Sequence, residues 1–306
     1  MMQFSLVIPV YNAGMMWPEV IRSIKSQTIQ PECVIIIDSS STDNTVAYAT
    51  EAGFEVYHID KSTFDHGGTR SMALERVNTE FVIYMTQDAI LQNDEAFFYL
   101  LSAFNNEEVG AVYGRQLPHH DANPLATHAR LHSYGEVGYV TSMKDDFPQG
   151  FRKAFMSNSF SGYRVSTLRQ IGGFPAKLIL GEDSYVAARM LSTGVSVGYI
   201  PQALARHSHN YSVGEEFKRY FDIGVFHKTQ EWMLASLGKV EGEGVKFALG
   251  QICYLLKSNY YHYIPFSIAS SGAKYLGYKL GKNYHRLNRT LCKKLSMYKS
   301  YWNSSV

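Results

Sequence analysis

The sequence predicts an α/β protein built on a mainly parallel sheet flanked by helices. Short apolar runs alternate with helical patterns along the first part of the 306-residue chain, and this β-α-β-α-β order is typical of parallel strands joined by right-handed crossovers. With 45% hydrophobic, 18% charged and 14% aromatic residues, the composition is that of a folded globular protein. The length allows two domains of ordinary size or one large α/β unit.

The first half of the chain predicts a regular series of elements. Apolar runs bounded by polar or turn residues indicate strands, and apolar residues three or four apart indicate helices. Sheets of this kind bind ligands at the carboxyl ends of their strands, where Asn12, Asp38 and Asp88 fall. The expected elements are strand 4–10, helix 17–27, strand 33–37, helix 45–52, strand 54–59, helix 69–77 and strand 81–85.

The second half is less regular. A capping-box pattern at Ser212 and Glu215 predicts a long helix that carries Phe217, Phe221 and Val225 inward. The other expected elements are loops over the site in 119–155, a strand, turn and helix over 162–173, a helix after Gly181 and a strand over 195–200.

The formal net charge of +2 is divided unevenly along the chain. From Gly244 to Val306 there are ten Lys or Arg and no Asp or Glu, so the remaining 19 of the 29 basic residues and all 27 acidic residues give residues 1–243 a net charge of −8. Interleaved Tyr and Lys suit an anionic membrane surface, and a solvated helical face is the alternative. Apolar residues at 245, 249, 252 and 256 have helical spacing.

Several classes of protein are disfavoured. Three widely spaced cysteines, Cys33, Cys253 and Cys292, form neither a CxxC site nor a closed disulfide framework and indicate a reducing cytosol. The amino terminus lacks a basic flank and breaks its apolar run with Pro9, which favours a strand over a signal peptide. The uncharged stretch 258–273 would span about 24 Å as a helix, less than a hydrocarbon core of about 30 Å. Any membrane contact is therefore expected to be peripheral.

Two further classes are disfavoured by particular features. The first expected strand is followed by Tyr-Asn-Ala-Gly and not by G-x-G-x-x-G, which argues against a dinucleotide-dependent oxidoreductase. A nucleic-acid partner is not expected, because the −8 body would repel a polyanion.

Polar residues at two expected strand and helix boundaries suit a nucleotide. Asp38 directly follows a buried strand, where a fixed acceptor can bind a base N–H or a ribose hydroxyl; capping of the turn is the alternative. Gly67 and Gly68 allow close backbone approach, and Arg70 at a helix start can add a bidentate phosphate or base contact. A Gly-Gly pair alone is most often an ordinary turn.

Carboxylates and imidazoles suggest a metal and a base. Asp88 follows strand 81–85 and could hold a divalent cation that bridges a diphosphate, or be a solvated strand-end acid. One of His207 and His209, two residues apart, is expected to reach that metal. The adjacent acids Glu182 and Asp183 at a helix start diverge, so that one can face a substrate as a base while the other pairs with a cation or caps the helix.

Together these motifs resemble glycosyltransferase family 2 in their order and spacing, over about residues 4–230. The Phe-Asp-His-Gly-Gly-Thr-Arg segment at 64–70 and the His-Ser-His-Asn-Tyr segment at 207–211 are most similar to bacterial rhamnosyltransferases of surface-polysaccharide assembly. The motifs are Val7-Ile8-Pro9-Val10-Tyr11-Asn12, Asp38 with the hydroxyl-rich run after it, His66-Gly67-Gly68-Thr69-Arg70, Gln87-Asp88-Ala89, Gly172-Gly173-Phe174 and Gly181-Glu182-Asp183.

The resemblance implies a GT-A fold with a Rossmann-like nucleotide-binding half. Residues 1–240 would be the catalytic domain, with a nucleotide-binding half over 1–115 and an acceptor half over 116–240, and 241–306 a basic, Tyr-rich helical tail outside the shared pattern. The implied reaction is inverting transfer from a sugar nucleotide, with dTDP-rhamnose favoured, to a saccharide acceptor that is expected on a lipid carrier. This places the protein in O-antigen, capsule or other surface-polysaccharide synthesis, on the cytoplasmic face of the membrane.

The resemblance also implies residue roles. Asp183 would be the catalytic base, with Glu182 beside it in an acceptor or supporting contact, and Mg²⁺ or Mn²⁺ would be held by Asp88, His207 and His209. Gln87-Asp88-Ala89 has one acid where many relatives have two. A non-catalytic module that binds sugar nucleotides or saccharides is the alternative, although it would have no reason to keep Asp183 and Asp88 together. The implied donor-binding residues are Pro9, Tyr11, Asn12, Asp38, His66, Gly67, Arg70, Gln87 and Asp88.

Overall fold

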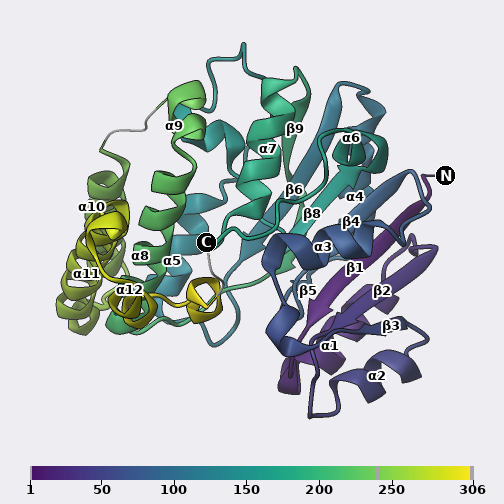
Figure 1. Cartoon of the computed structure of the whole chain (residues 1–306), viewed down its shortest axis with the longest axis horizontal. Coiled ribbons are helices and arrows are strands. Elements are labelled where there is room, and N and C mark those ends of the chain that lie inside the picture. Colours follow the sequence, from purple (N-terminus) through teal and green to yellow (C-terminus); the bar gives the residue numbers. More distant parts are fainter. Residues whose placement is uncertain (1, 239–241, 304–306) are drawn as a thin grey trace.

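A computed structural model describes residues 2–238 and 242–303. In that part of the chain one nine-stranded sheet runs in the order β3-β2-β1-β4-β8-β6-β9-β5, with β7 paired to β9 (Figure 1). The strands are β1 (Phe4–Val10), β2 (Cys33–Asp38), β3 (Glu55–His58), β4 (Phe81–Met85), β5 (Ile90–Leu91), β6 (Val109–Leu117), β7 (Tyr139–Thr141), β8 (Phe160–Arg164) and β9 (Ser196–Arg206).

Helices connect these strands and make up the carboxyl-terminal region. The α-helices are α1 (Trp17–Lys25), α2 (Thr45–Glu51), α3 (His66–Leu74), α4 (Ala96–Ser102), α5 (Pro124–Ser133), α6 (Val165–Gln170), α7 (Glu182–Ser192), α8 (Val213–Thr229), α9 (Glu231–Leu237), α10 (Glu243–Lys257), α11 (Ile264–Lys282) and α12 (Arg289–Leu295). The short 3-10 helices are η1 (Gly14–Met16), η2 (Lys61–Thr63), η3 (Ala103–Asn105), η4 (Gly150–Ala154), η5 (Tyr261–Tyr263), η6 (Tyr284–Arg286) and η7 (Lys299–Trp302).

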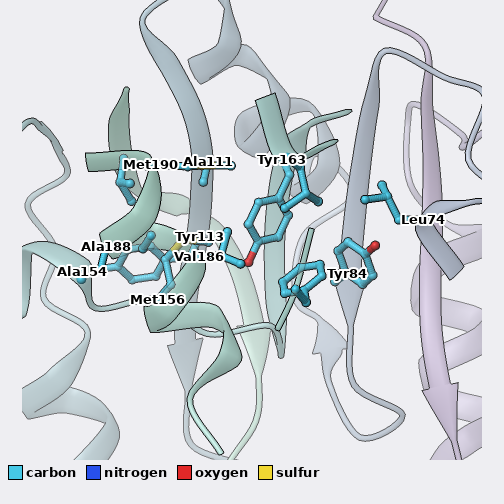
Figure 2. Close-up of a cluster of buried hydrophobic side chains, with 14 of the residues drawn as sticks. Leu74, Tyr84, Ala111, Tyr113, Ala154, Met156, Tyr163, Val186, Ala188 and Met190 are labelled. Carbon is cyan, nitrogen blue, oxygen red and sulfur yellow. The ribbon is translucent and has the colours of Figure 1, made fainter. Parts of the chain in front are cut away.

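Both faces of the sheet are buried, which explains why the central strands are apolar throughout. Successive side chains of a strand point to opposite faces, so Val7 and Ile35 join one core while Leu6 and Ile36 join the other. The first core packs against α3, α6, α7 and α8, and the second against α1, α2 and α4. Figure 2 shows part of the first core, in which Tyr84 of β4 lies toward Leu74 of α3, while Val186, Ala188 and Met190 of α7 lie on the other side of Tyr163 of β8.

The strand directions bring several chain segments to one edge. β3, β2, β1 and β4 are parallel, β8 is antiparallel to both β4 and β6, and β6 is parallel to β9. Val10 and Asp38 are register partners at the ends of β1 and β2. The segments after β1, β2 and β4 therefore leave the sheet on the same side, as expected of a parallel sheet. The α/β, mainly parallel fold predicted from the sequence is confirmed.

The predicted elements of the first half are present with shifted ends. The largest shift is at α3, which begins at His66 and not at Thr69. The Asp65 carboxylate accepts the Gly68 N–H at 2.6 Å as an N-cap, so that Gly67 and Gly68 lie inside the first turn.

The prediction of loops throughout 119–155 was wrong, because this segment contains α5, β7 and η4. The side chain of Asn123 accepts the Ala126 N–H and caps α5, and Pro124 occupies the first turn, where its missing N–H costs nothing. The strand expected over 195–200 continues to Arg206, past a register shift in its pairing with β6.

The capping box at Ser212 and Glu215 is confirmed at the start of α8. Phe221 and Val225 are buried as expected, but Phe217 is only partly buried. The expected boundary between residues 240 and 241 lies outside the described residues.

The carboxyl-terminal region is helical, as predicted, and packs closely on the rest of the protein. α11 lies against α8 with glycine at the crossing, since a Cβ at Gly277 or Gly281 would clash with backbone atoms of Phe217 or Phe221, and one at Gly224 with the Tyr278 carbonyl. The two backbones therefore meet directly at a point where only glycine fits. In residues 2–238 and 242–303 no helix is long and apolar enough to cross a bilayer.

Substitution of Gly281 tests this helix crossing. Gly281→Ala is expected to lower the free energy of unfolding by about 1–3 kcal/mol, because the added methyl group forces the two helices apart. The matched control is Gly272→Ala on the same helix, where a methyl group meets no neighbouring atom and helix propensity improves. Urea unfolding of both variants measures the difference; equal stability would show that the helices do not meet at Gly281.

Candidate active site

The segments that follow β1 and β4 are joined by a reciprocal pair of hydrogen bonds. The Tyr11 N–H donates to the Gln87 side-chain oxygen at 2.7 Å, and the Gln87 amide donates to the Tyr11 carbonyl at 3.2 Å. Lys61 donates to the Tyr11 hydroxyl at 2.6 Å and lies over its ring. Pro9, two residues before Tyr11, lies in β1 opposite Ile37. These bonds fix the position of Asp88 relative to the end of β1.

The segments after β1 and β2 are joined in a similar way. Asn12, with a positive φ of 44°, donates its N–H to the Ser41 hydroxyl and accepts the Thr42 N–H. Asp38 is almost completely buried, accepts the Ser41 N–H at 3.2 Å and lies 3.1 Å from His58 Nδ1. Asp38 thus stabilises the turn after β2, which was the alternative to ligand contact, and its contact with a nucleotide stays a prediction.

The first turn of α3 faces the first turn of α7. Gly67 is required by packing, because a Cβ there would clash with the Pro175 carbonyl. Arg70, one turn later, is buried and forms an ion pair with Glu182 at 3.0 Å, and it also donates to the His66 carbonyl at 2.8 Å. The predicted contact of Arg70 with a nucleotide remains untested, while its contact with Glu182 links the two halves of the site.

The adjacent acids Glu182 and Asp183 have different surroundings. Glu182 is buried; burial opposes its charge, but Arg70 and His66 outweigh that effect and lower its pKa. Asp183 is partly exposed and accepts the Asn158 N–H at 3.1 Å and the Ser184 N–H at 2.7 Å. Its low-dielectric surroundings, together with the negative charge of Glu182, raise the pKa of Asp183 to about 7. A carboxylate with this pKa is suited to accept a proton near neutral pH.

Asp88, His207 and His209 form a cluster with the geometry of a metal site. His207 Nε2 lies 3.5 Å and His209 Nε2 lies 3.9 Å from the Asp88 carboxylate, and one ligand atom from each residue falls within 4.8 Å of the others. Burial disfavours the charge of Asp88, but both imidazoles counteract it and the pKa of Asp88 is lowered. One carboxylate and two imidazoles fit a divalent transition metal such as Mn²⁺.

Hydrogen bonds behind His207 prepare it to bind a metal. The Gln116 side-chain oxygen accepts from Arg130 at 2.8 Å, which fixes its orientation, and it lies 3.0 Å from His207 Nδ1. Nδ1 must therefore carry the proton, leaving the Nε2 lone pair toward Asp88. Burial lowers the pKa of His207 to about 3, so the imidazole is neutral at physiological pH. Sequence analysis missed Gln116 and Arg130, because tertiary structure brings them together: the pairing of β6 with β9 places Gln116 behind His207, and Arg130 reaches Gln116 from α5.

A cavity of about 350 Å³ adjoins this cluster. Its lining includes His209, Tyr211 and Asn210 from the segment after β9, His119 from the segment after β6, and Met16 near the start of α1. The cavity is thus bounded by both halves of the sheet, and it is open to a ligand that reaches His209.

The arrangement brings a candidate base, Asp183, close to the cluster of metal-ligand type. Asn158 and Ser159, at the start of β8, lie between the two groups, since Asn158 donates to Asp183 and Ser159 lies 3.4 Å from His207 Nε2. The predicted residues therefore fall into three connected groups around β1, β4 and β8. The first contains Tyr11 and Gln87, the second Glu182 and Asp183, and the third Asp88 and His207. Such a site can hold a charged leaving group on one side and deprotonate a hydroxyl on the other.

Comparison with known proteins agrees with this geometry. The chain is 46% identical over 305 residues to the O-antigen chain rhamnosyltransferase RfbN of Salmonella typhimurium, which covers 99% of this chain and 97% of that protein. It is 47% identical over 306 residues to the O-antigen chain rhamnosyltransferase WbaN of Salmonella anatum, with the same coverage.

Solved structures share the fold at low sequence identity. The mannosyltransferase PcManGT from Pyrobaculum calidifontis, solved with GDP-Man and Mn²⁺, matches 99% of this chain and 88% of its own with a TM-score of 0.59 and 16% identity. A fragment of Staphylococcus aureus TarS with UDP-GlcNAc matches 93% of this chain and 92% of its own, with a TM-score of 0.53 and 14% identity. These similarities confirm the GT-A fold. The model of glycosyl transferase family 2 matches residues 5–172, and together with the two relatives it shows that the chain belongs to glycosyltransferase family 2.

Proposed function

We propose that this protein is an inverting rhamnosyltransferase that moves L-rhamnose from dTDP-rhamnose to a lipid-linked saccharide in O-antigen or related surface-polysaccharide synthesis. The observation that carries this proposal is the 46–47% identity, over nearly the whole chain, to two O-antigen chain rhamnosyltransferases. The geometry of the site supports transfer over mere binding, because a module that only binds sugars has no use for a partly buried base with a pKa of about 7.

In the proposed reaction, Asp183 accepts the proton of an acceptor hydroxyl. That oxygen attacks the anomeric carbon from the face opposite the nucleoside diphosphate, which inverts the configuration, so that a β-linked donor yields an α-rhamnoside. Glu182 and Arg70 remain paired and hold the first turn of α7 in position. Asp88, His207 and His209 would hold a divalent cation, which would supply positive charge next to the diphosphate.

The donor contacts are part of the same proposal. Tyr11, Asn12, Asp38, Gln87 and Asp88 surround the ends of β1, β2 and β4, where a nucleotide would lie outside the sheet. Pro9, His66, Gly67 and Arg70 complete the proposed set of donor-binding residues.

A membrane location is supported by the outer face of α10 and α11. In α11, exposed Ile268, Tyr275, Leu276 and Leu280 recur at helical spacing, and Lys279 and Lys282 lie among them. Val245, Leu249 and Leu256 are exposed on α10, which packs beside α11. We propose that this apolar and cationic face, hereafter the α10–α11 face, rests on the anionic inner surface of the cytoplasmic membrane, where each approaching cation contributes about 1 kcal/mol.

Removal of the base tests the catalytic assignment. Asp183→Asn is expected to lower kcat by roughly 10²- to 10⁴-fold, since general-base catalysis contributes about that much, while affinity for dTDP stays within about twofold. For the parent protein, kcat should increase with pH up to about 7 and level off above it, because only the ionised carboxylate accepts a proton. Steady-state transfer assays across pH and calorimetric titration with dTDP measure both effects. Near-normal turnover of the variant would reject Asp183 as the base.

Metal removal tests the cluster. Mn²⁺ is expected to strengthen dTDP binding by at least about tenfold relative to chelator, because it neutralises the diphosphate, and Asp88→Asn should abolish most of that gain. Asp94→Asn, which removes an exposed acid near β5, serves as the control and should keep it. Calorimetry with and without chelator decides the matter: equal dTDP affinity of the parent protein in both conditions contradicts the metal assignment.

Liposome binding tests the α10–α11 face. The double variant Leu249→Gln and Ile268→Gln should sediment less with vesicles containing phosphatidylglycerol, because both side chains are more than half exposed on that face. Phe98→Gln removes a similarly exposed ring from α4 and should bind as the parent protein does. Binding of the parent protein should weaken as salt rises. Equal sedimentation of all three proteins, or no response to salt, would assign the face to another partner.

A further inference from the structure

Arg219, on the second turn of α8, is a cation of the site that sequence analysis did not single out. Its guanidinium lies 5.6 Å from the centre of the Tyr211 ring, and that ring lies 5.2 Å from His209 of the metal-type cluster. Its charge acts on His209 and also on His66 at the start of α3. Arg219 is therefore linked to His209 through the Tyr211 ring and lies within electrostatic range of His66.

Arg219, unlike Arg70 of the same site, forms no ion pair in the part of the chain that the structure describes. Within residues 2–238 and 242–303, no carboxylate lies within ion-pair distance of its guanidinium. Glu216, one turn earlier on α8, pairs instead with Lys274 of α11 at 3.1 Å. By contrast, Arg70 pairs with Glu182 and Arg130 donates to Gln116. The positive charge of Arg219 is thus left for a ligand.

The carboxyl-terminal segment helps to hold Arg219 in place. The buried Asp222, one turn after Arg219 on α8, accepts the backbone N–H groups of Met297 at 2.8 Å and Tyr298 at 3.1 Å. This contact brings the Tyr298 ring to 4.8 Å from the His66 ring and within electrostatic range of Arg219. Tyr211 and Tyr298 thus lie around Arg219, so a residue 79 positions after Arg219 in the sequence contributes to this side of the site.

The chemistry of a guanidinium in these surroundings indicates a phosphate group. Arg219 is partly buried beside the Tyr211 ring, and the planar fork of its guanidinium matches two phosphate oxygens. The Tyr211 ring contacts both the Arg219 guanidinium and His209, so the anion that suits Arg219 is one that the metal-type cluster would also bind, which is a diphosphate. This assignment rests on the proposed function. The part of the ligand that suits Arg219 is the phosphate that is bonded to the sugar in the donor.

We propose that Arg219 binds the terminal phosphate of the departing nucleoside diphosphate, and that Tyr298 is a positioning residue that holds the Arg219 side chain for this contact. In the transfer step the bond between the anomeric carbon and the phosphate oxygen breaks, and its electron pair stays on that oxygen. The acceptor oxygen forms the new bond and gives its proton to Asp183. Arg219 donates hydrogen bonds to the phosphate throughout and loses no proton.

The test compares two ligands that differ by one phosphate. Calorimetric titrations of the full chain with dTDP and with dTMP, both with Mn²⁺, are carried out for Arg219→Gln and for the control Lys218→Gln, which removes the neighbouring cation of α8. Arg219→Gln is expected to weaken dTDP binding by about 10- to 100-fold and dTMP binding by less than about twofold, as for loss of a charged hydrogen-bond pair. Lys218→Gln should leave both affinities unchanged.

Tyr298 variants test the positioning role. Tyr298→Ala should weaken dTDP binding several-fold without affecting dTMP, whereas Tyr298→Phe, which keeps the ring, should restore it. Arg219→Lys keeps the positive charge but lacks the planar guanidinium, so it should lose part of the dTDP affinity. It replaces Arg219→Gln in the test if Arg219→Gln does not fold.

Each outcome has a distinct meaning. An equal loss of dTDP and dTMP affinity, or no loss in either Arg219 variant, would overturn the assignment of Arg219. Failure of Tyr298→Phe to restore binding would overturn the positioning role of Tyr298. If the parent protein does not bind dTDP, UDP or GDP, a sugar nucleotide is rejected as the donor. That result does not depend on the variants.

Discussion

The ion pair between Arg70 and Glu182 is the contact on which the rest of the site depends. It joins α3, which follows the nucleotide-side strands, to α7, which carries Asp183, and both side chains are buried. Removing either partner would leave an uncompensated charge in the interior, at a cost of about 3–5 kcal/mol. The pair also has an electrostatic effect on catalysis: the Glu182 charge next to Asp183 raises the pKa of Asp183, while Arg70 keeps Glu182 itself ionised.

The second half of the site combines an oriented imidazole with a cation. His207 is oriented by Gln116 and Arg130, and Arg219 lies beside Tyr211 without a carboxylate partner in the described part of the chain. A ligand with two phosphates would supply negative charge to Arg219. The carboxyl-terminal helices take part in this arrangement, because α11 packs on α8 through glycine contacts and Asp222 of α8 holds the Tyr298 segment.

The sequence predicted much of this, for identifiable physical reasons. The parallel strands and the carboxyl-edge location of Asp38 and Asp88 follow from apolar runs ending at polar residues, and the capping box of α8 was visible directly. Contacts between distant segments could not be predicted, because they depend on tertiary packing. Examples are the contacts of Arg70 with Glu182, of Gln116 with His207 and of Tyr298 with His66. The helix α5 was missed although Asn123 and Pro124 form a start signal, because its polar face and its histidines hide the apolar periodicity.

The central claim is that Asp183 is held as a base that titrates near neutral pH. An NMR titration of isotope-labelled aspartate carboxyl carbons, with Asp183→Asn used to assign the Asp183 signal, measures its pKa directly in the full-length protein. The account predicts a midpoint near 7, raised from the ordinary value by burial and by Glu182, and a lower midpoint when Glu182→Gln removes the neighbouring charge. A midpoint near the ordinary aspartate value of about 4 in the parent protein would contradict it.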